Sequence, residues 1–118
     1  MLIEQRKKIF LHAYRSGVGH LASCFSCVEL LHTLYNGVMT ADDHFVLSKG
    51  HSALALYVTL AERGYFDESE IEHFGGEPNM LDTPGVEAST GSLGHGLGIP
   101  LGMALALKSD ELKGIVYC

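Results

Sequence analysis

The sequence has little positive charge, with 8 Lys and Arg residues against 14 Asp and Glu residues and a formal net charge of −6. Nucleic acids and anionic membranes bind non-specifically to surfaces that are rich in Lys and Arg. The composition therefore excludes both as non-specific partners. A phosphate site stays open, because a few backbone amides can bind an anion inside an acidic protein.

Cysteine, proline and long apolar runs are also scarce. Three cysteines, an odd number, do not suit a disulfide framework, so we expect reduced thiols and a cytoplasmic protein. The longest apolar stretch, Leu93–Leu107, is shorter than the ~20 residues of a membrane span and contains His95 and Pro100. With only three prolines and 47% hydrophobic residues, the chain is expected to fold, and 118 residues make one small domain at most.

Helical and strand patterns alternate along the chain. The expected helices cover residues 2–14, 26–36, 53–63, 67–74 and 93–108, and the expected strands cover residues 45–47 and 115–117. The second helix is predicted to start at Ser26, because Ser26 and Glu29 have the spacing of a capping box. This order of elements indicates an α/β fold with parallel strands. Two strands are few for such a sheet, so the chain is expected to form the opening part of an α/β domain.

The same patterns predict which residues are buried. The last helix, 93–108, is apolar and is expected to lie in the core. His12, His32 and His73 fall on helices beside polar neighbours and are expected at the surface or its boundary. The acidic stretch 68–72 is expected to be a solvated helix face.

Four segments combine glycine with residues that suit chemistry, namely 16–20, 48–51, 83–89 and 90–96. A histidine that follows a glycine at the end of an element can point into a cleft, where it can exchange protons near neutral pH. A glycine-rich turn that leads into a helix lets backbone amides approach an anion. Each segment alone is typical of an ordinary turn, so only their combination is informative.

The order and the amino-acid sequences of these segments resemble the N-terminal section of transketolase, a thiamine-diphosphate enzyme family. The matching motifs are Gly19–His20 with Ser26–Leu30, then Ser48–His51, then Thr83–Gly94. The resemblance implies that residues 1–118 form the opening part of a doubly wound parallel-sheet domain that binds thiamine diphosphate. The reaction that it implies for a complete enzyme is transfer of a two-carbon ketol unit from a ketose to an aldose.

The resemblance also implies roles for individual residues. His20 and His51 correspond to catalytic histidines near the reactive carbon of the cofactor and the bound sugar. The residues that correspond to cofactor-binding positions are His51, Gly91, Ser92, Leu93 and His95. His95 stands where the family commonly has glutamine, so either a site role or a helix-packing role is open for it.

A second departure from the family lies at Gly76-Glu77-Pro78, where Gly-His-Pro is common. A glutamate there would repel an anionic or phosphorylated donor that a histidine would attract. The usual preference for sugar phosphates is therefore in question for this chain.

The metal that the family uses, Mg²⁺ or Ca²⁺, is held by residues that follow a strand resembling Ile115–Tyr117. The sequence ends at Cys118, so we expect no metal ligands in this chain. The family's activating glutamate lies on a separate domain. The chain alone is thus expected to be inactive, and to need a C-terminal section or second subunit before a sugar or sugar-phosphate substrate can react. An incomplete sheet also predicts oligomers or binding to a partner.

Other interpretations stay open at this point. The chain could be a non-catalytic remnant or interaction protein, or a fragment that resembles 1-deoxyxylulose-5-phosphate synthase. Cys24 and Cys27 have redox or zinc spacing, although a packing role is favoured because no second pair exists. Asp42-Asp43-His44 could bind a metal, but is more typical of a solvated turn with Asp42 or Asp43 as its cap.

Overall fold

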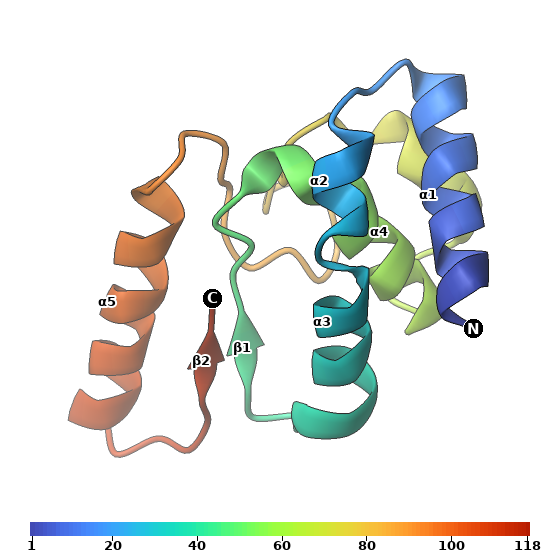
Figure 1. Ribbon diagram of the computed structural model, residues 1–118. Coiled ribbons are helices and arrows are strands. Elements are labelled where there is room, and N and C mark those ends of the chain that lie inside the picture. The colour runs from blue at the N-terminus through green and yellow to red at the C-terminus, as the bar shows by residue number, and fades with distance from the viewer.

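The computed structural model describes every residue from Met1 to Cys118. Helices make up about half of the chain, and two short strands and several connecting loops make up the rest (Figure 1). In chain order the elements are α1 (Leu2–Ser16), α2 (Leu21–Phe25), α3 (Val28–Thr33), the π-helical turn η1 (Leu34–Val38), β1 (His44–Phe45), the 3-10 turn η2 (Gly50–Ser52), α4 (Ala53–Glu62), the 3-10 helix η3 (Glu68–His73), α5 (His95–Ser109) and β2 (Val116–Tyr117). None of the helices combines the length and apolar character that crossing a bilayer requires.

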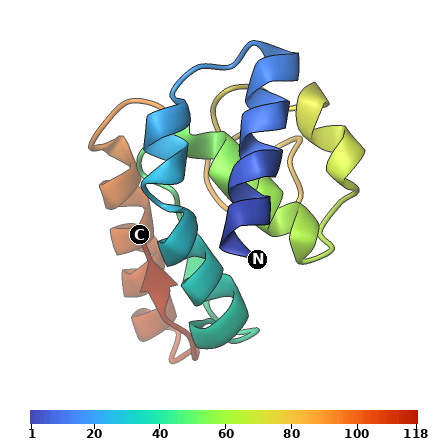
Figure 2. The ribbon, with the colours of Figure 1, turned by 45° about the vertical axis from the view of Figure 1, so that its right-hand side comes forward.

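Helix α4 is the centre of the hydrophobic core. Every residue from Ala53 to Leu60 is buried, and α1, α3 and η3 pack around it (Figure 2). Tyr57 and Leu60 are among the largest fully buried side chains. The predicted helix 53–63 is confirmed, and Gly64 follows it with a φ of 81°, a left-handed conformation that glycine adopts without strain.

The two strands pair in parallel, which the order of elements predicted. His44 is opposite Val116, and Phe45 is opposite Tyr117. The amide of His44 donates to the carbonyl of Ile115, and that of Val46 donates to the carbonyl of Tyr117. The fold is therefore α/β, and Figure 1 shows α5 beside β2, on the side of the strands away from α1 and α4.

The predicted helix from Ser26 to Asn36 is present but begins later: α3 starts at Val28, and Cys27 rather than Ser26 stands at its N-cap. The separate helix α2, which was not predicted, ends just before it at Phe25. The capping box does not form: the oxygen of the Ser26 side chain accepts no hydrogen bond from the amides of α3, and its hydroxyl donates back to the carbonyl of Ser23. The chain then continues past Asn36 through the π-helical turn η1.

The prediction that the last helix is buried is also wrong. Of its 15 residues only Gly96 and Pro100 are buried, and Leu97 and Leu101 are 64% and 61% exposed. The helix touches the rest of the chain along one narrow edge, on which Gly96 and Pro100 are buried and Met103 and Leu107 are half-buried. Apolar composition therefore predicted the helix but not its environment, because no element of this chain covers its outer face.

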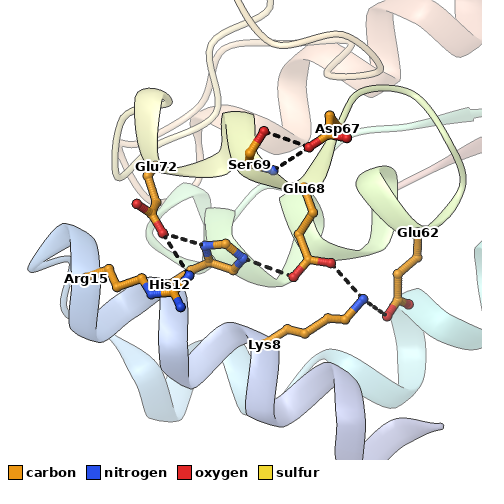
Figure 3. A network of polar contacts seen from close by, with 8 residues as sticks. All are labelled: Lys8, His12, Arg15, Glu62, Asp67, Glu68, Ser69 and Glu72. Atoms are coloured by element: carbon orange, nitrogen blue, oxygen red, sulfur yellow. Dashed lines mark hydrogen bonds and ion pairs between the residues drawn. The ribbon is translucent and has the colours of Figure 1, made fainter.

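Helices α1 and η3 are joined by a network of charged side chains (Figure 3). The imidazole of His12 lies between two carboxylates, with Nε2 3.3 Å from Glu68 and Nδ1 3.4 Å from Glu72. Lys8 Nζ lies 2.9 Å from Glu68, and Arg15 lies 3.3 Å from Glu72. The acidic stretch 68–72 is largely exposed, as predicted, but the carboxylates of Glu68 and Glu72 also pair with α1. His12 is only 3% exposed, so its predicted surface position is wrong, whereas His32 is half-buried and His73 is exposed as expected.

This network makes the stability of the fold depend on pH in the acid range. The ammonium group of Lys8 lowers the pKa of Glu68 below its usual value of 4.5, with a smaller contribution from His12. A lowered carboxyl pKa stabilises the fold above pH 4.5, and this stabilisation is lost as the pH falls through the lower folded-state value. We expect Glu68→Gln to cost about 0.5–1 kcal/mol near neutral pH, because the pair is partly exposed. The difference in the free energy of unfolding between Glu68→Gln and the native chain should vanish in acid.

The measurement is denaturant unfolding of both proteins between neutral pH and pH 3. Glu70→Gln is the matched control, because Glu70 lies on the same element η3 but pairs only with the exposed His73. A Glu68→Gln penalty that stays constant down to pH 3 would contradict the electrostatic origin of this contact.

Candidate functional site

The end of β1 and the glycine-rich turn before α5 are in direct contact, although about forty residues separate them. A Cβ built on Gly50 would lie 2.7 Å from the carbonyl oxygen of Thr90 and 2.9 Å from the amide nitrogen of Gly91. Only glycine permits so close an approach. The Thr90 hydroxyl donates to the carbonyl of Leu47 at 2.6 Å and fixes the same contact from the other side.

The two predicted catalytic histidines are neighbours. The rings of His20 and His51 meet edge to face, with centroids 5.1 Å apart and planes at 63°. His20 is exposed and His51 is half-buried. The hydroxyls of Ser23 and Ser52 hydrogen-bond at 2.6 Å and hold α2 against η2, the two elements that carry these histidines. His51 follows Gly50 directly, so this pair adjoins the turn at Gly91.

His20 has an unusual backbone conformation at the N-cap of α2. Its φ is 62°, in the left-handed region that few residues other than glycine occupy, although histidine is one of the more tolerant types there. Non-glycine residues held in this region cost free energy and cluster at functional sites. The backbone of His20 is therefore held in a conformation that is typical of functional sites.

The turn before α5 offers an anion site. The backbone amides of Gly91, Ser92, Leu93 and Gly94 donate no hydrogen bond within the chain. Gly94, with a φ of 90°, begins a helix of 15 residues, and the N-terminal end of a helix carries partial positive charge. Four free amides in a row at such an end suit a diphosphate, so the residues present fit the anionic part of thiamine diphosphate.

A cavity of about 770 Å³ opens beside this turn. It is lined by three of the predicted cofactor-binding residues, Gly91, Ser92 and His95, together with Glu77, Asn79 and Thr90. Leu93 lies outside this cavity, is 72% exposed, and lines a smaller apolar cavity on the other side of the turn. His20 and His51 line neither cavity. The structure thus brings the predicted residues into one region but not into one pocket.

Two residues near the site were missed by sequence reasoning. The Tyr57 hydroxyl donates to the carbonyls of Gly75 and Glu77 and fixes the loop that forms one wall of the cavity. Burial raises the pKa of Tyr57 to about 12, so it stays a neutral donor. Lys49 is held by α2, where its ammonium group donates to the carbonyl of Ser23 and the hydroxyl of Ser26. A tyrosine among the mostly apolar residues of helix α4 was the one available signal.

The alternative metal and redox sites do not form. Cys24 and Cys27 are free and buried, and burial raises the pKa of both thiols, so they pack as small apolar residues. The carboxylate of Asp43 accepts from the amides of Thr40 and Ile115, which lowers its pKa, and it caps the turn as predicted. No group of three or more His, Cys, Asp or Glu residues is arranged to hold a metal ion.

Comparison with known proteins now identifies the family. Residues 14–113 match the family described as "Transketolase, thiamine diphosphate binding domain". This chain is a member of the transketolase family. The match covers every motif on which the resemblance was based, so the prediction from the sequence is confirmed at the level of the family and its N-terminal, thiamine-diphosphate-binding section.

Several relatives in this family are named as transketolase subunits. An apulose-4-phosphate transketolase subunit of Phocaeicola vulgatus is 36% identical over 97% of this chain and 46% of its own length. The "6-deoxy-6-sulfo-D-fructose transketolase subunit SqwG" of a Clostridium species is 38% identical over 86% of this chain and 42% of its own length. The "Transketolase" of Pongo abelii is 37% identical over 87% of this chain but only 19% of its own length. The chain thus spans about half the length of the relatives that are named as subunits.

Proposed function

We propose that this chain supplies the thiamine-diphosphate-binding part of a transketolase that transfers a two-carbon ketol unit from a ketose to an aldose. The observation that supports the proposal most strongly is the contact of Gly50 with Thr90 and Gly91, which adjoins two histidines and four free amides. The proposed reaction follows from membership of the transketolase family. When bound, the cofactor acts as the electron sink for the two-carbon fragment.

The residues of the chain divide into two groups in this proposal. The amides of Gly91, Ser92 and Leu93 hold the diphosphate, with His51 beside it and His95 in the adjoining cavity. His20 and His51 exchange protons with the hydroxyls of the sugar, which suits imidazoles because they titrate near neutral pH. The left-handed backbone of His20 and its contact with the ring of His51 support a fixed mutual position for these two groups.

We further propose that the chain works with a second polypeptide section. Three of the relatives are named as subunits, which supports a partner for this chain as well. The exposed leucines of α5 support it too, because a stable fold seldom leaves so apolar a helix uncovered. The partner section would complete a doubly wound parallel sheet, and would carry the ligands for Mg²⁺ or Ca²⁺, so that residues 1–118 form part of a domain. The three free cysteines support a reducing compartment such as the cytoplasm.

Thermal unfolding of the chain with thiamine diphosphate tests the proposal. A ligand that binds only the folded state raises the unfolding temperature as its concentration rises, by an amount that corresponds to about 1.4 kcal/mol at ten times the dissociation constant. We expect such a rise at millimolar thiamine diphosphate with Mg²⁺. Thiamine without phosphate is the matched control and should give no rise, because it cannot reach the free amides as an anion.

Two outcomes would contradict the proposal. An unfolding temperature that does not change with thiamine diphosphate would favour a non-catalytic remnant of the fold. An equal rise with thiamine and with thiamine diphosphate would show that the amides of Gly91–Gly94 do not hold the diphosphate.

A further inference from the structure

We infer that a cavity at the start of β1 binds a small zwitterion of the α-amino-acid type, whose carboxylate meets Arg63 and Tyr35 and whose ammonium group meets Glu87. The cavity has a volume of about 510 Å³. It lies beside the first residue of β1, whereas the candidate site described above adjoins the end of that strand at Gly50. The inference goes beyond the proposed function and does not depend on it.

Tyr35 is a buried polar side chain without a hydrogen-bond partner. It is 7% exposed, lines the cavity, and packs edge to face on Phe45, with ring centroids 5.8 Å apart. The hydrogen bonds around the cavity do not include its hydroxyl. Burial raises the pKa of Tyr35, with smaller contributions from Tyr65 and Glu87, so the hydroxyl stays protonated. A buried donor without an acceptor costs free energy, and a ligand in the cavity can supply that acceptor.

Arg63 is the one arginine of the chain without an ion pair. Arg6 and Arg15 each pair with a glutamate, whereas the guanidinium group of Arg63 reaches only the side chain of Asn36, at 3.5 Å. Arg63 stands at the C-cap of α4 and lines the cavity. The remaining N–H groups of its planar guanidinium match the two oxygens of a carboxylate.

Two carboxylates that line the same cavity are held by backbone amides. Glu87 accepts a hydrogen bond from the amide of Phe45 at 3.0 Å, and its other oxygen meets Nδ1 of His44. Asp43 accepts hydrogen bonds from two further amides. Neither carboxylate pairs with Arg63, so groups of opposite charge line one cavity without contacting each other. A zwitterion can pair with both, whereas a simple anion or cation would face a group of its own sign.

The rest of the lining suits an apolar side chain. Met39, Ala41 and the ring of Tyr65 supply apolar surface. The Tyr65 ring packs closely on Gly85, where a built Cβ would lie 2.5 Å from Cδ1 of the ring, and Gly85 has a φ of 83°. Glycine at this position therefore allows the Tyr65 ring to form one wall of the cavity.

L-leucine is the probe, and its binding is followed by the NMR shifts of the amides of residues 39–44 and 63–65. Leucinamide lacks the carboxylate and isocaproate lacks the amino group, so they are the matched ligands. We expect saturable binding of L-leucine at millimolar concentration. Either analogue should bind roughly ten-fold more weakly or worse, because each loses a hydrogen-bonded ion pair.

Tyr35→Phe removes only the unpartnered hydroxyl. The unfolding temperature of the free chain should stay the same or rise slightly, while L-leucine should bind about ten-fold more weakly. Arg63→Gln should weaken binding by a similar factor, and Arg63→Lys should restore only part of it, because an ammonium group lacks the planar fork. Arg15→Gln is the control for lost charge, because Arg15 lies outside this cavity and should leave binding unchanged.

Three results would overturn the inference. The first is the absence of saturable shifts with L-leucine, and the second is equal binding of leucinamide or isocaproate. The third is an affinity for L-leucine that either Tyr35→Phe or Arg63→Gln leaves unchanged. The thermal test with thiamine diphosphate reports separately on the proposed function, because stabilisation by thiamine diphosphate should be the same in Tyr35→Phe and the native chain.

Discussion

Replacing Gly50 with alanine is expected to separate the end of β1 from the turn at Thr90–Gly91. The new Cβ would lie under 3 Å from three backbone atoms, which cannot rotate away as a side chain could. Overpacking of this kind costs about 1–3 kcal/mol, and here the backbone partners place the effect at the upper end. Thermal unfolding should show a large fall in unfolding temperature, and the variant should lose any stabilisation by thiamine diphosphate.

Gly37→Ala is the matched control for this substitution. Gly37 has no neighbour within 4 Å of a built Cβ and no positive φ, so alanine should leave stability nearly unchanged or raise it slightly. If Gly50→Ala unfolds at the temperature of the native chain and still responds to thiamine diphosphate, the close contact between the two motifs is not needed for binding.

The second large effect concerns the attachment of α5. A Cβ on Gly96 would overlap the backbone of Ser48 and lie 2.7 Å from its hydroxyl oxygen. Because α5 is anchored through this narrow edge, we expect Gly96→Ala to destabilise the chain by about 2–3 kcal/mol and to expose the amides of β1 and β2 to hydrogen exchange.

Gly102→Ala on the same helix should have the opposite effect on stability. Gly102 is exposed, with no neighbour near a built Cβ, and alanine in a helix is favoured over glycine by about 0.5–1 kcal/mol. A stabilising Gly96→Ala would contradict the anchoring of α5 at Ser48, since helix propensity would then outweigh the overlap.

Local patterns predicted much of the fold correctly. Helices α1 and α4 and the strands near residues 45 and 116 lie where periodicity placed them, because each is determined by neighbours within a few residues. The helix predicted from Ser26 begins later, at Val28, and the predicted capping box does not form, since the Ser26 hydroxyl makes a different local hydrogen bond, to the carbonyl of Ser23. The roles of His20, His51 and the residues of the turn stay predictions.

Burial was predicted less well, for one physical reason. His12 looks like a surface residue from its neighbours in sequence, but Glu68 and Glu72 pack over it from an element more than fifty residues away. Helix α5 looks like a core helix from its composition, but burial requires a covering element. In both cases burial depends on what packs against the residue from elsewhere in the chain, and the neighbouring residues in the sequence carry no information about that.

The sequence by itself determined the family and the order of the motifs, because these depend on residue types at fixed local spacing. It also marked Glu77 as a departure from the family pattern. The tertiary structure alone decided that His20 meets His51, that Gly50 touches Gly91, and that the side chain of Glu77 lies against Gly91. Those contacts join segments that are distant along the chain, and only packing of the helices around α4 brings such segments together.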